Sequence, residues 1–343
     1  MITTPPRRFP RVVIIIPVYN AAAYLQECLD SISRQRYKQF DVFAVNDGSS
    51  DNSGSILDAY ATSNRWLKVI HKANGGVSSA RNAALNALSD AYKYVSFVDS
   101  DDTLEPNYLS ELVSTAEKES ADLVAFLSKS FDKCSTYYEQ KSEYAVLNSD
   151  GIWRSCLSPK GDGCFWTMHK NFMSYAVVKD IRFDESLSIA EDADFLFRAI
   201  MSIKKCVLLP EYLYNYRIRK SSLCHDIKND LRLNNDSAIA FEKVDATRIP
   251  KDLLSEYYRF IFRFEFKAMY LATNARLGED DFEKRKWRIL RLPKPKDTGQ
   301  KRFQFKYTLL HFGFAINRLY YRISCALKNR KRISHPSTAN MFE

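Results

Sequence analysis

Short β-rich runs alternate with helical patterns through the first 130 residues of this chain, and this alternation strongly restricts its fold. Runs rich in aliphatic and aromatic residues occupy 12–16, 41–45, 67–71, 94–98 and 123–127. Amphipathic helical patterns lie between them, at 22–35, 53–62, 77–88 and 107–118. Strands and helices that alternate at this spacing predict βαβ units and a mainly parallel sheet.

Polar loops follow three of these strands, at 17–20, 46–50 and 99–102. In open parallel sheets, ligands bind beyond the carboxyl ends of the strands. We therefore expect these three loops to share one rim of the sheet, although they are far apart in the sequence.

The last of these loops is acidic. Asp99, Asp101 and Asp102 directly follow the apolar run at 94–98. Carboxylates this close repel one another, and Mg²⁺ or Mn²⁺ is a natural partner because these ions favour oxygen ligands and phosphate. The alternative is that the acids cap a helix that opens at Glu105-Pro106, and Asp102 is the one best suited to that role.

Other polar segments have both a binding and a purely structural interpretation. Asp47-Gly48 can present a carboxylate to a nucleobase, or simply form a turn. Gly75-Gly76 precedes a helix, where free N–H groups favour an anion, or forms an ordinary loop. Glu191 and Asp192 open a further helix, where acids also suit the helix dipole. The segment 214–222 combines aromatic and cationic residues, and could clamp a diphosphate or end a solvated strand.

Five segments together make the sequence similar to glycosyltransferase family 2. They are Ile16-Pro17-Val18-Tyr19-Asn20, Asn46-Asp47-Gly48-Ser49-Ser50-Asp51, Asn74-Gly75-Gly76-Val77-Ser78-Ser79-Ala80-Arg81-Asn82, Phe97-Val98-Asp99-Ser100-Asp101-Asp102 and Glu191-Asp192. The resemblance covers roughly residues 11 to 222, in the order and spacing of the family. It implies an α/β GT-A fold, Rossmann-like with flanking helices, and inverting transfer of a sugar from a nucleoside diphosphate, with UDP favoured over GDP or dTDP.

The resemblance also implies roles for single residues. It assigns the general base to Asp192 and the metal, Mg²⁺ or Mn²⁺, to Asp101 with Asp99, which also reaches the ribose. The remaining nucleotide contacts would come from Pro17, Tyr19, Asp47, Arg81 and Arg217, of which Asp47 would contact the base and Arg217 the diphosphate. The acceptor would be a glycan or a lipid-linked glycan of bacterial surface polysaccharide synthesis.

Charge is concentrated near the end of the chain. The net charge is +10, and residues 282–343 contain sixteen Lys and Arg against three Asp and Glu. An amphipathic helix is predicted there from Phe305 to Leu327, which would lie on an anionic membrane or pack against the catalytic domain. We expect a catalytic domain over 1–225 and a helical, basic region over 226–343.

Composition and motifs also weigh against other classes of protein. The seven cysteines lack Cys-x-x-Cys spacing and no apolar run is long enough to span a bilayer, so we expect a cytoplasmic protein, peripheral at most on the membrane. A sugar-nucleotide pyrophosphorylase would show a glycine-rich loop after the first strand, whereas this chain has Pro17-Val18-Tyr19-Asn20 there. A processive synthase would show membrane spans and a Gln-x-x-Arg-Trp motif, and the sequence contains neither. A nucleic-acid-binding protein is supported only by the basic tail, and we expect no nucleic-acid partner.

Overall fold

The computed structural model describes residues 9–132, 135–138, 143–157, 167–187, 189–219, 236–274 and 279–293. The chain divides into a larger unit, Met1–Ser222 with Ala240–Lys251, and a smaller unit, Leu223–Ile239 with Asp252–Glu343. The domain boundary predicted at 225 and the tail helix predicted from Phe305 to Leu327 lie outside the described residues.

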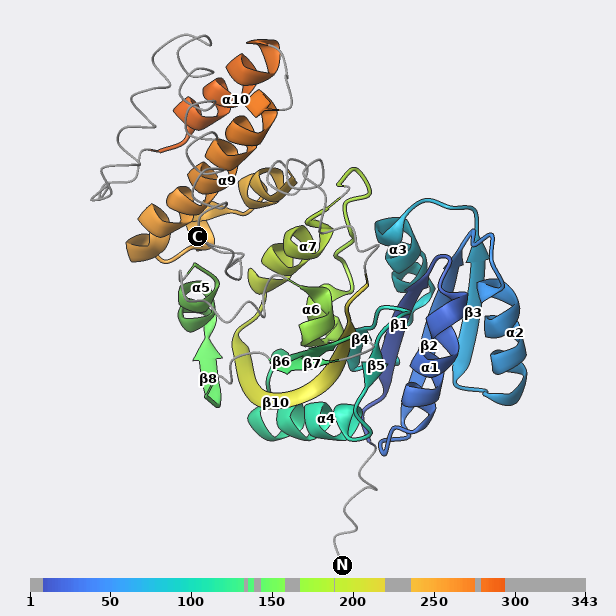
Figure 1. Cartoon of the computed structure of the whole chain (residues 1–343). Helices are drawn as coiled ribbons and strands as arrows, with labels where there is room; N and C mark the ends of the chain where they lie inside the picture. Colours follow the sequence, from blue (N-terminus) through green and yellow to red (C-terminus); the bar gives the residue numbers. More distant parts are fainter. Residues whose placement is uncertain are drawn as a thin grey trace, which may run out of the picture. The chain divides into compact units, whose positions relative to one another are not determined.

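The larger unit is built on one mixed sheet, whose described strands run in the order β3-β2-β1-β4-β9-β6-β10-β5 (Figure 1). Strand β7 pairs with β6 and β8 pairs with β10. The strands are β1 (Val12–Val18), β2 (Phe40–Asp47), β3 (Leu67–Lys72), β4 (Tyr94–Phe97), β5 (Thr103–Leu104), β6 (Leu123–Phe131), β7 (Thr136–Tyr138), β8 (Ala145–Asn148), β9 (Asn171–Ser174) and β10 (Lys205–Arg217).

Parallel pairing joins β3, β2, β1 and β4, and also β6 with β10. The predicted α/β sheet is therefore confirmed, and each of the five predicted strands is present. The helices of the larger unit are α1 (Ala22–Ser33), α2 (Ser53–Ser63), α3 (Val77–Ala87), α4 (Tyr108–Glu119), α5 (Ser149–Leu157), α6 (Tyr175–Val178) and α7 (Glu191–Ile200), with short 3₁₀ turns η2 (Met168–Lys170) and η4 (Ala246–Arg248).

Strand β1 shows why the sheet is covered on both faces. Its sequence is almost wholly aliphatic, and Val12 to Ile16 are fully buried. Ile14 and Ile16 belong to the core cluster that also contains Leu25 and Leu29 of α1. On neighbouring β4, Phe97 packs instead against Phe183 and against Phe195 of α7, with ring centroids 5.5 and 5.9 Å apart. A parallel strand that is buried on both faces has a nearly continuous apolar sequence, and β1 has such a sequence.

The second half of the sheet is less regular. Strand β9 is inserted antiparallel between β4 and β6. Strand β10 is thirteen residues long, and its register against β6 shifts between Leu209 and Tyr212. Pro210 lies at that shift, and proline, which has no N–H to donate, is tolerated in sheets mainly at such irregularities. β10 thus continues to the rim that carries Arg217.

The smaller unit is helical where it is described. Helix α9 (Leu254–Asn274) is followed by α10 (Glu279–Arg291), and the short 3₁₀ turn η5 (Lys251–Leu253) precedes α9. The Glu265 carboxylate of α9 is fully buried and pairs with Arg288 at 3.2 Å and Arg285 at 3.6 Å, both on α10. None of the helices in the described ranges combines the length and the apolar character that a bilayer crossing requires.

Candidate active site

The loops after β1 and β2 are joined by hydrogen bonds at the rim of the sheet. The Asn20 side-chain oxygen accepts from the Ser50 backbone N–H at 2.8 Å, and the Asn20 N–H donates to Ser49 Oγ at 3.1 Å. Asn20 has φ +49°, a left-handed conformation that asparagine tolerates better than most residues. Loops 17–20 and 46–50 thus lie together, as their positions after parallel strands predict. Tyr19 is 54 % exposed beside them, and Pro17 is half-buried at the end of β1.

Asp47 ends β2, and its carboxylate is held by the glycine loop that precedes α3. It accepts from the Gly75 N–H at 3.0 Å, from the Gly76 N–H at 2.8 Å and from Lys72 Nζ at 2.6 Å. Its side chain is only 3 % exposed. A nucleobase N–H that binds Asp47 would therefore have to replace one of these donors.

Gly48 is required by the same close packing. Its φ of +68° is left-handed, and a Cβ built on it would lie 2.7 Å from the backbone nitrogen of Asn74. Such a distance excludes a side chain unless one of the two loops moves. The glycine therefore lets the turn after β2 touch the loop before α3.

Arg81, in the second turn of α3, is a meeting point of acidic residues. Among the described residues it forms ion pairs with Asp192 at 2.6 Å, Glu191 at 3.1 Å and Asp99 at 3.3 Å. The Arg81 side chain is 4 % exposed. Burial opposes its charge, but the surrounding carboxylates, Asp192 first, raise the pKa of Arg81. The structure thus brings together three of the predicted site residues, Arg81, Asp99 and Asp192.

The N-terminus of α7 presents Asp192 toward Arg81. Asp192 Oδ2 also accepts from the Met168 N–H of η2 at 3.0 Å. Ala190, which precedes the helix, has φ +66°, an unfavourable value for a residue with a side chain. Backbone strain of this kind is concentrated at functional sites, where surrounding contacts compensate for it.

Glu191 was not among the predicted site residues, although it adjoins Asp192. Burial and the neighbouring Asp192 charge raise the pKa of Glu191 to about 7, against the opposing effect of Arg81. A sequence pattern gives no sign of this, because the pKa depends on α3 packing against α7.

The three acids after β4 have different surroundings. Asp101 Oδ2 pairs with Arg219 Nε at 2.6 Å, whereas the Asp99 side chain is 35 % exposed. Asp102 is fully buried, and it accepts from the Tyr214 hydroxyl at 2.7 Å and from the Arg217 N–H at 2.7 Å. Burial and the other two aspartates raise the pKa of Asp102, and burial and Asp99 raise that of Asp101.

The expectation that Asp102 caps a helix is wrong. Helix α4 begins at Tyr108 after Asn107, and Thr103–Leu104 form strand β5 between Asp102 and that helix. The short antiparallel pairing of β5 with β10 turns Asp102 into the core instead of toward a helix end.

Arg217 and Arg219 lie at the end of β10, beside the acidic turn. Arg217 Nε donates to the Asp101 carbonyl at 2.8 Å, and its Nη2 pairs with Glu27 at 2.5 Å. Arg219, which the sequence analysis did not select, is the residue that pairs with the Asp101 carboxylate. The available signal was its place in the cationic segment 214–222, but which arginine faces the acids depends on the pairing of β10.

The Asp99 and Asp101 carboxylates fit a hard divalent cation. Mg²⁺ is commonly bound through one or two carboxylates together with substrate phosphates and waters. Within the described ranges, no group of three or more His, Cys, Asp or Glu residues is arranged to hold a metal, so phosphate oxygens would have to complete the coordination. Burial raises the pKa of Asp101, and the Asp99 charge adds to this effect against the opposing charges of Arg219 and Arg217.

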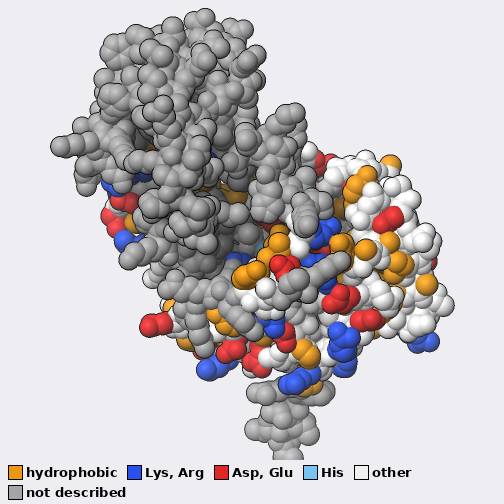
Figure 2. Space-filling view, in the orientation of Figure 1, with side chains coloured by type: hydrophobic (Ala, Val, Ile, Leu, Met, Phe, Trp, Pro, Cys, Tyr) orange, Lys and Arg blue, Asp and Glu red, His pale blue; other side chains and the backbone are white. Residues whose placement is uncertain are grey.

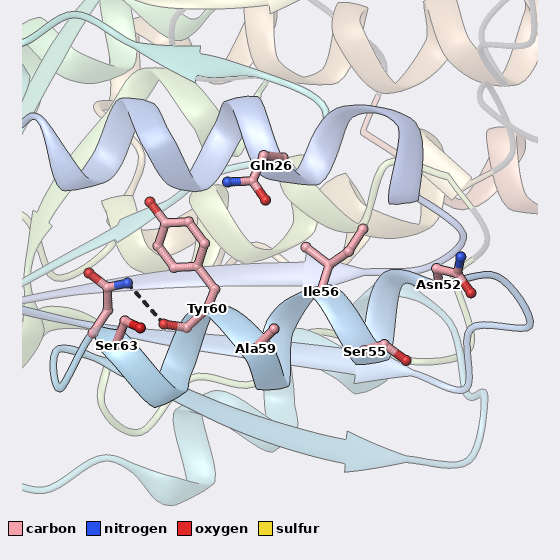
Figure 3. Close-up of a pocket in the computed structure, with 8 residues that line it drawn as sticks. Gln26, Asn52, Ser55, Ile56, Ala59, Tyr60 and Ser63 are labelled. Atoms are coloured by element: carbon pink, nitrogen blue, oxygen red, sulfur yellow. Dashed lines mark hydrogen bonds between the residues drawn. The ribbon is translucent and has the colours of Figure 1, made fainter.

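A groove elsewhere on the larger unit does not coincide with this rim. It lies between α1 and α2, where Gln26 faces Ile56 and Tyr60 (Figure 3). It contains none of the predicted site residues. On the face seen in Figure 2, acidic and basic side chains are intermingled over the described part of the larger unit.

The sequence of the chain is similar to that of known glycosyltransferases. Residues 13–182 match the model of glycosyl transferase family 2. The chain is 32 % identical over 218 residues to the uncharacterized glycosyltransferase EpsJ of Bacillus subtilis, an alignment that covers 62 % of this chain and 63 % of EpsJ. The chain thus spans less than two thirds of this relative.

Solved structures show the same fold. TarS residues 1–349 of S. aureus, in complex with UDP, align with a TM-score of 0.65 at 20 % identity, over 91 % of this chain and 89 % of that one. The mannosyltransferase PcManGT of Pyrobaculum calidifontis, in complex with GDP-Man and Mn²⁺, aligns with a TM-score of 0.55 at 17 % identity, over 94 % and 88 %.

The sheet and its acidic rim define a protein of the GT-A fold class. With the family match over residues 13–182, the chain belongs to glycosyl transferase family 2.

Proposed function

We propose that the protein is a metal-dependent, inverting glycosyltransferase that transfers a sugar from a nucleoside-diphosphate sugar, with UDP favoured, to a glycan or lipid-linked acceptor of surface polysaccharide synthesis. One observation carries most of this proposal. Asp99 and Asp192 are far apart in sequence, yet both contact the same buried guanidinium. The proposed donor-binding acid and the proposed base thus lie close to one guanidinium, which supports the proposal of a single displacement.

The donor side of the site would be formed by the acidic turn and the end of β10. Asp101 and Asp99 would hold Mg²⁺ or Mn²⁺, and a cation bound there neutralises the charge that develops on the leaving diphosphate. Arg217 would add positive charge toward the diphosphate. Tyr19 and Pro17 would flank the nucleoside, and Asp47 would accept from its base.

Asp192 would act as the general base. An acceptor hydroxyl is a weak nucleophile until a positioned carboxylate takes its proton, which contributes about 10²–10⁴-fold in rate. Because one displacement inverts the anomeric centre, the base must lie on the face opposite the leaving diphosphate. Asp192 reaches the rim from α7, a separate element from the β4 turn that carries Asp99 and Asp101.

The test is a donor panel. The protein is incubated with Mn²⁺, UDP-, GDP- and dTDP-sugars and acceptor glycans, and released nucleoside diphosphate and the product anomer are measured. Asp192→Asn should reduce transfer by about 10²–10⁴-fold while UDP binding persists, and Asp180→Asn, at an exposed position outside the site, should transfer normally. Full turnover by Asp192→Asn would refute the base assignment, and nucleoside triphosphate formed from pyrophosphate would indicate a pyrophosphorylase.

A further inference from the structure

Arg81 connects the two sides of the proposed site. Its Nη2 contacts Asp99 at 3.3 Å, on the donor side, and its Nη1 contacts Asp192 at 2.6 Å, on the side of the base. Nη1 also pairs with Glu191 at 3.1 Å. One side chain from α3 therefore fixes the relative position of the β4 turn and the start of α7.

The surroundings of Arg81 make its charge effective. Its guanidinium lies over the Phe183 ring, 5.1 Å from the centroid, and the side chain is almost fully buried. In the described part of the chain its Nε has no hydrogen-bond partner, so its contacts are made through the two terminal nitrogens. Charges that are shielded from water in this way interact more strongly than exposed ones.

Asp192 is held from two directions. Oδ1 accepts from Arg81, and Oδ2 accepts from the Met168 N–H at 3.0 Å. A carboxylate oxygen can accept two hydrogen bonds, so each oxygen retains a site for an acceptor hydroxyl. The two contacts therefore orient the Asp192 carboxylate and still leave its oxygens able to accept a proton.

We propose that Arg81 is a positioning residue that pairs with Asp192 and aims its carboxylate as the general base, a role distinct from contact with the nucleotide. This inference rests on the proposed function. Without Arg81, the neighbouring Glu191 and Asp192 carboxylates would face each other with no cation between them, and Asp192 would lose one of the two contacts that orient it. Its carboxylate would then no longer be aimed at the acceptor hydroxyl.

The charged groups around Asp192 come from several elements. Arg81 lies on α3, Asp99 follows β4, and Glu191 precedes Asp192 on α7. η2 carries His169 and Lys170 beside Met168. Further along α7, Asp194 pairs with Arg198 and Lys243, which form a separate network.

The test compares kcat against pH for wild type and four variants. Arg81→Met should move the acid limb of the profile up by about 1 pH unit or more, because an opposite charge at this range shifts a carboxyl by 1–3 units. Arg81→Lys should restore most of that shift, and Glu191→Gln, which removes one repelling charge, should move the limb down. Arg198→Met breaks a different ion pair on α7 and should leave the limb in place.

Two results would overturn the proposal. The first is an Arg81→Met enzyme that raises only the KM for the donor, with an unmoved pH profile. The second comes from thermal unfolding, which needs no turnover and so remains informative if the proposed reaction is wrong. Arg81→Met with Asp192→Asn should unfold at a higher temperature than Arg81→Met alone, because the second change removes a charge left without its partner. Strictly additive midpoints would exclude the coupling.

Discussion

The Tyr214 hydroxyl donates to the buried Asp102 carboxylate at 2.7 Å and accepts from the Asp99 backbone N–H at 3.1 Å. One phenol therefore ties the turn that carries the acids to β10. The third aspartate of this turn, Asp102, thereby anchors the turn that also carries Asp99 and Asp101.

Tyr214→Phe tests this support. It removes the donor to a buried carboxylate, so we expect a loss of about 1–3 kcal/mol in the free energy of unfolding, measured by urea denaturation. Because the turn that holds Asp99 loses its anchor, Mn²⁺ affinity in the presence of UDP should also fall in calorimetric titrations. Tyr216→Phe, two residues further along β10, is the matched control. Equal Mn²⁺ affinity in both variants would contradict a supporting role.

Glu191 predicts how stability changes with pH. Its pKa is raised to about 7 in the folded protein from an ordinary 4.5, so the folded state binds more protons between these values. The stabilising contribution of Glu191 to the free energy of unfolding is thus fully present below pH 4.5 and is lost as pH rises through about 7. When the urea midpoint of unfolding is measured from pH 4.5 to 8, the midpoint of Glu191→Gln should decrease less with rising pH than that of wild type. A variant whose slope equals that of wild type would disprove the assignment.

Gly48→Ala separates steric conflict from backbone strain. An added Cβ would meet the Asn74 backbone nitrogen at 2.7 Å, and the left-handed conformation adds about 1–2 kcal/mol of strain. Thermal unfolding should therefore show a loss for Gly48→Ala that exceeds the roughly 1–2 kcal/mol of backbone strain alone. A loss within that range would mean that the contact with Asn74 is relaxed at little cost.

Asp47→Asn tests the proposed contact with the nucleobase. The change removes the ion pair with Lys72 and weakens the bonds from Gly75 and Gly76, so UDP affinity should fall about tenfold or more, as expected for about 1.4 kcal/mol. Isothermal titration calorimetry with UDP measures this affinity. Lys72→Met removes the ion pair but leaves the carboxylate, and should bind UDP more tightly than Asp47→Asn. If Lys72→Met bound UDP more weakly than Asp47→Asn, the nucleobase would not contact Asp47.

Local pattern accounts for the first half of the sheet but not for the second. The apolar run at 12–16 and the helix pattern at 22–35 need only neighbouring residues to be read, and they match β1 and α1 closely. The antiparallel insertion of β9 between β4 and β6 depends on pairing with residues about 50 and 80 positions away, as from Met173 to Leu123 and Val95. Nothing within Asn171–Ser174 indicates which strands it will join.

The site shows the same division. Asp99 and Asp192 follow from motif order, and the structure brings both to Arg81. Asp102 was misjudged because its environment is created by β10, over a hundred residues later. Arg219 was passed over for a similar reason, since its partner Asp101 comes from a distant turn.

Helix α3 links the two kinds of contact that this site needs. The glycine amides just before it bind Asp47, and Arg81, one turn further, binds Asp99 and Asp192. Arg81 lies five positions after Gly76, about 7.5 Å along a helix axis. The same short helix thus carries the contact to the carboxylate proposed to meet the nucleobase and the guanidinium that holds the carboxylate proposed as the base, so the proposed donor and acceptor sides share one structural support.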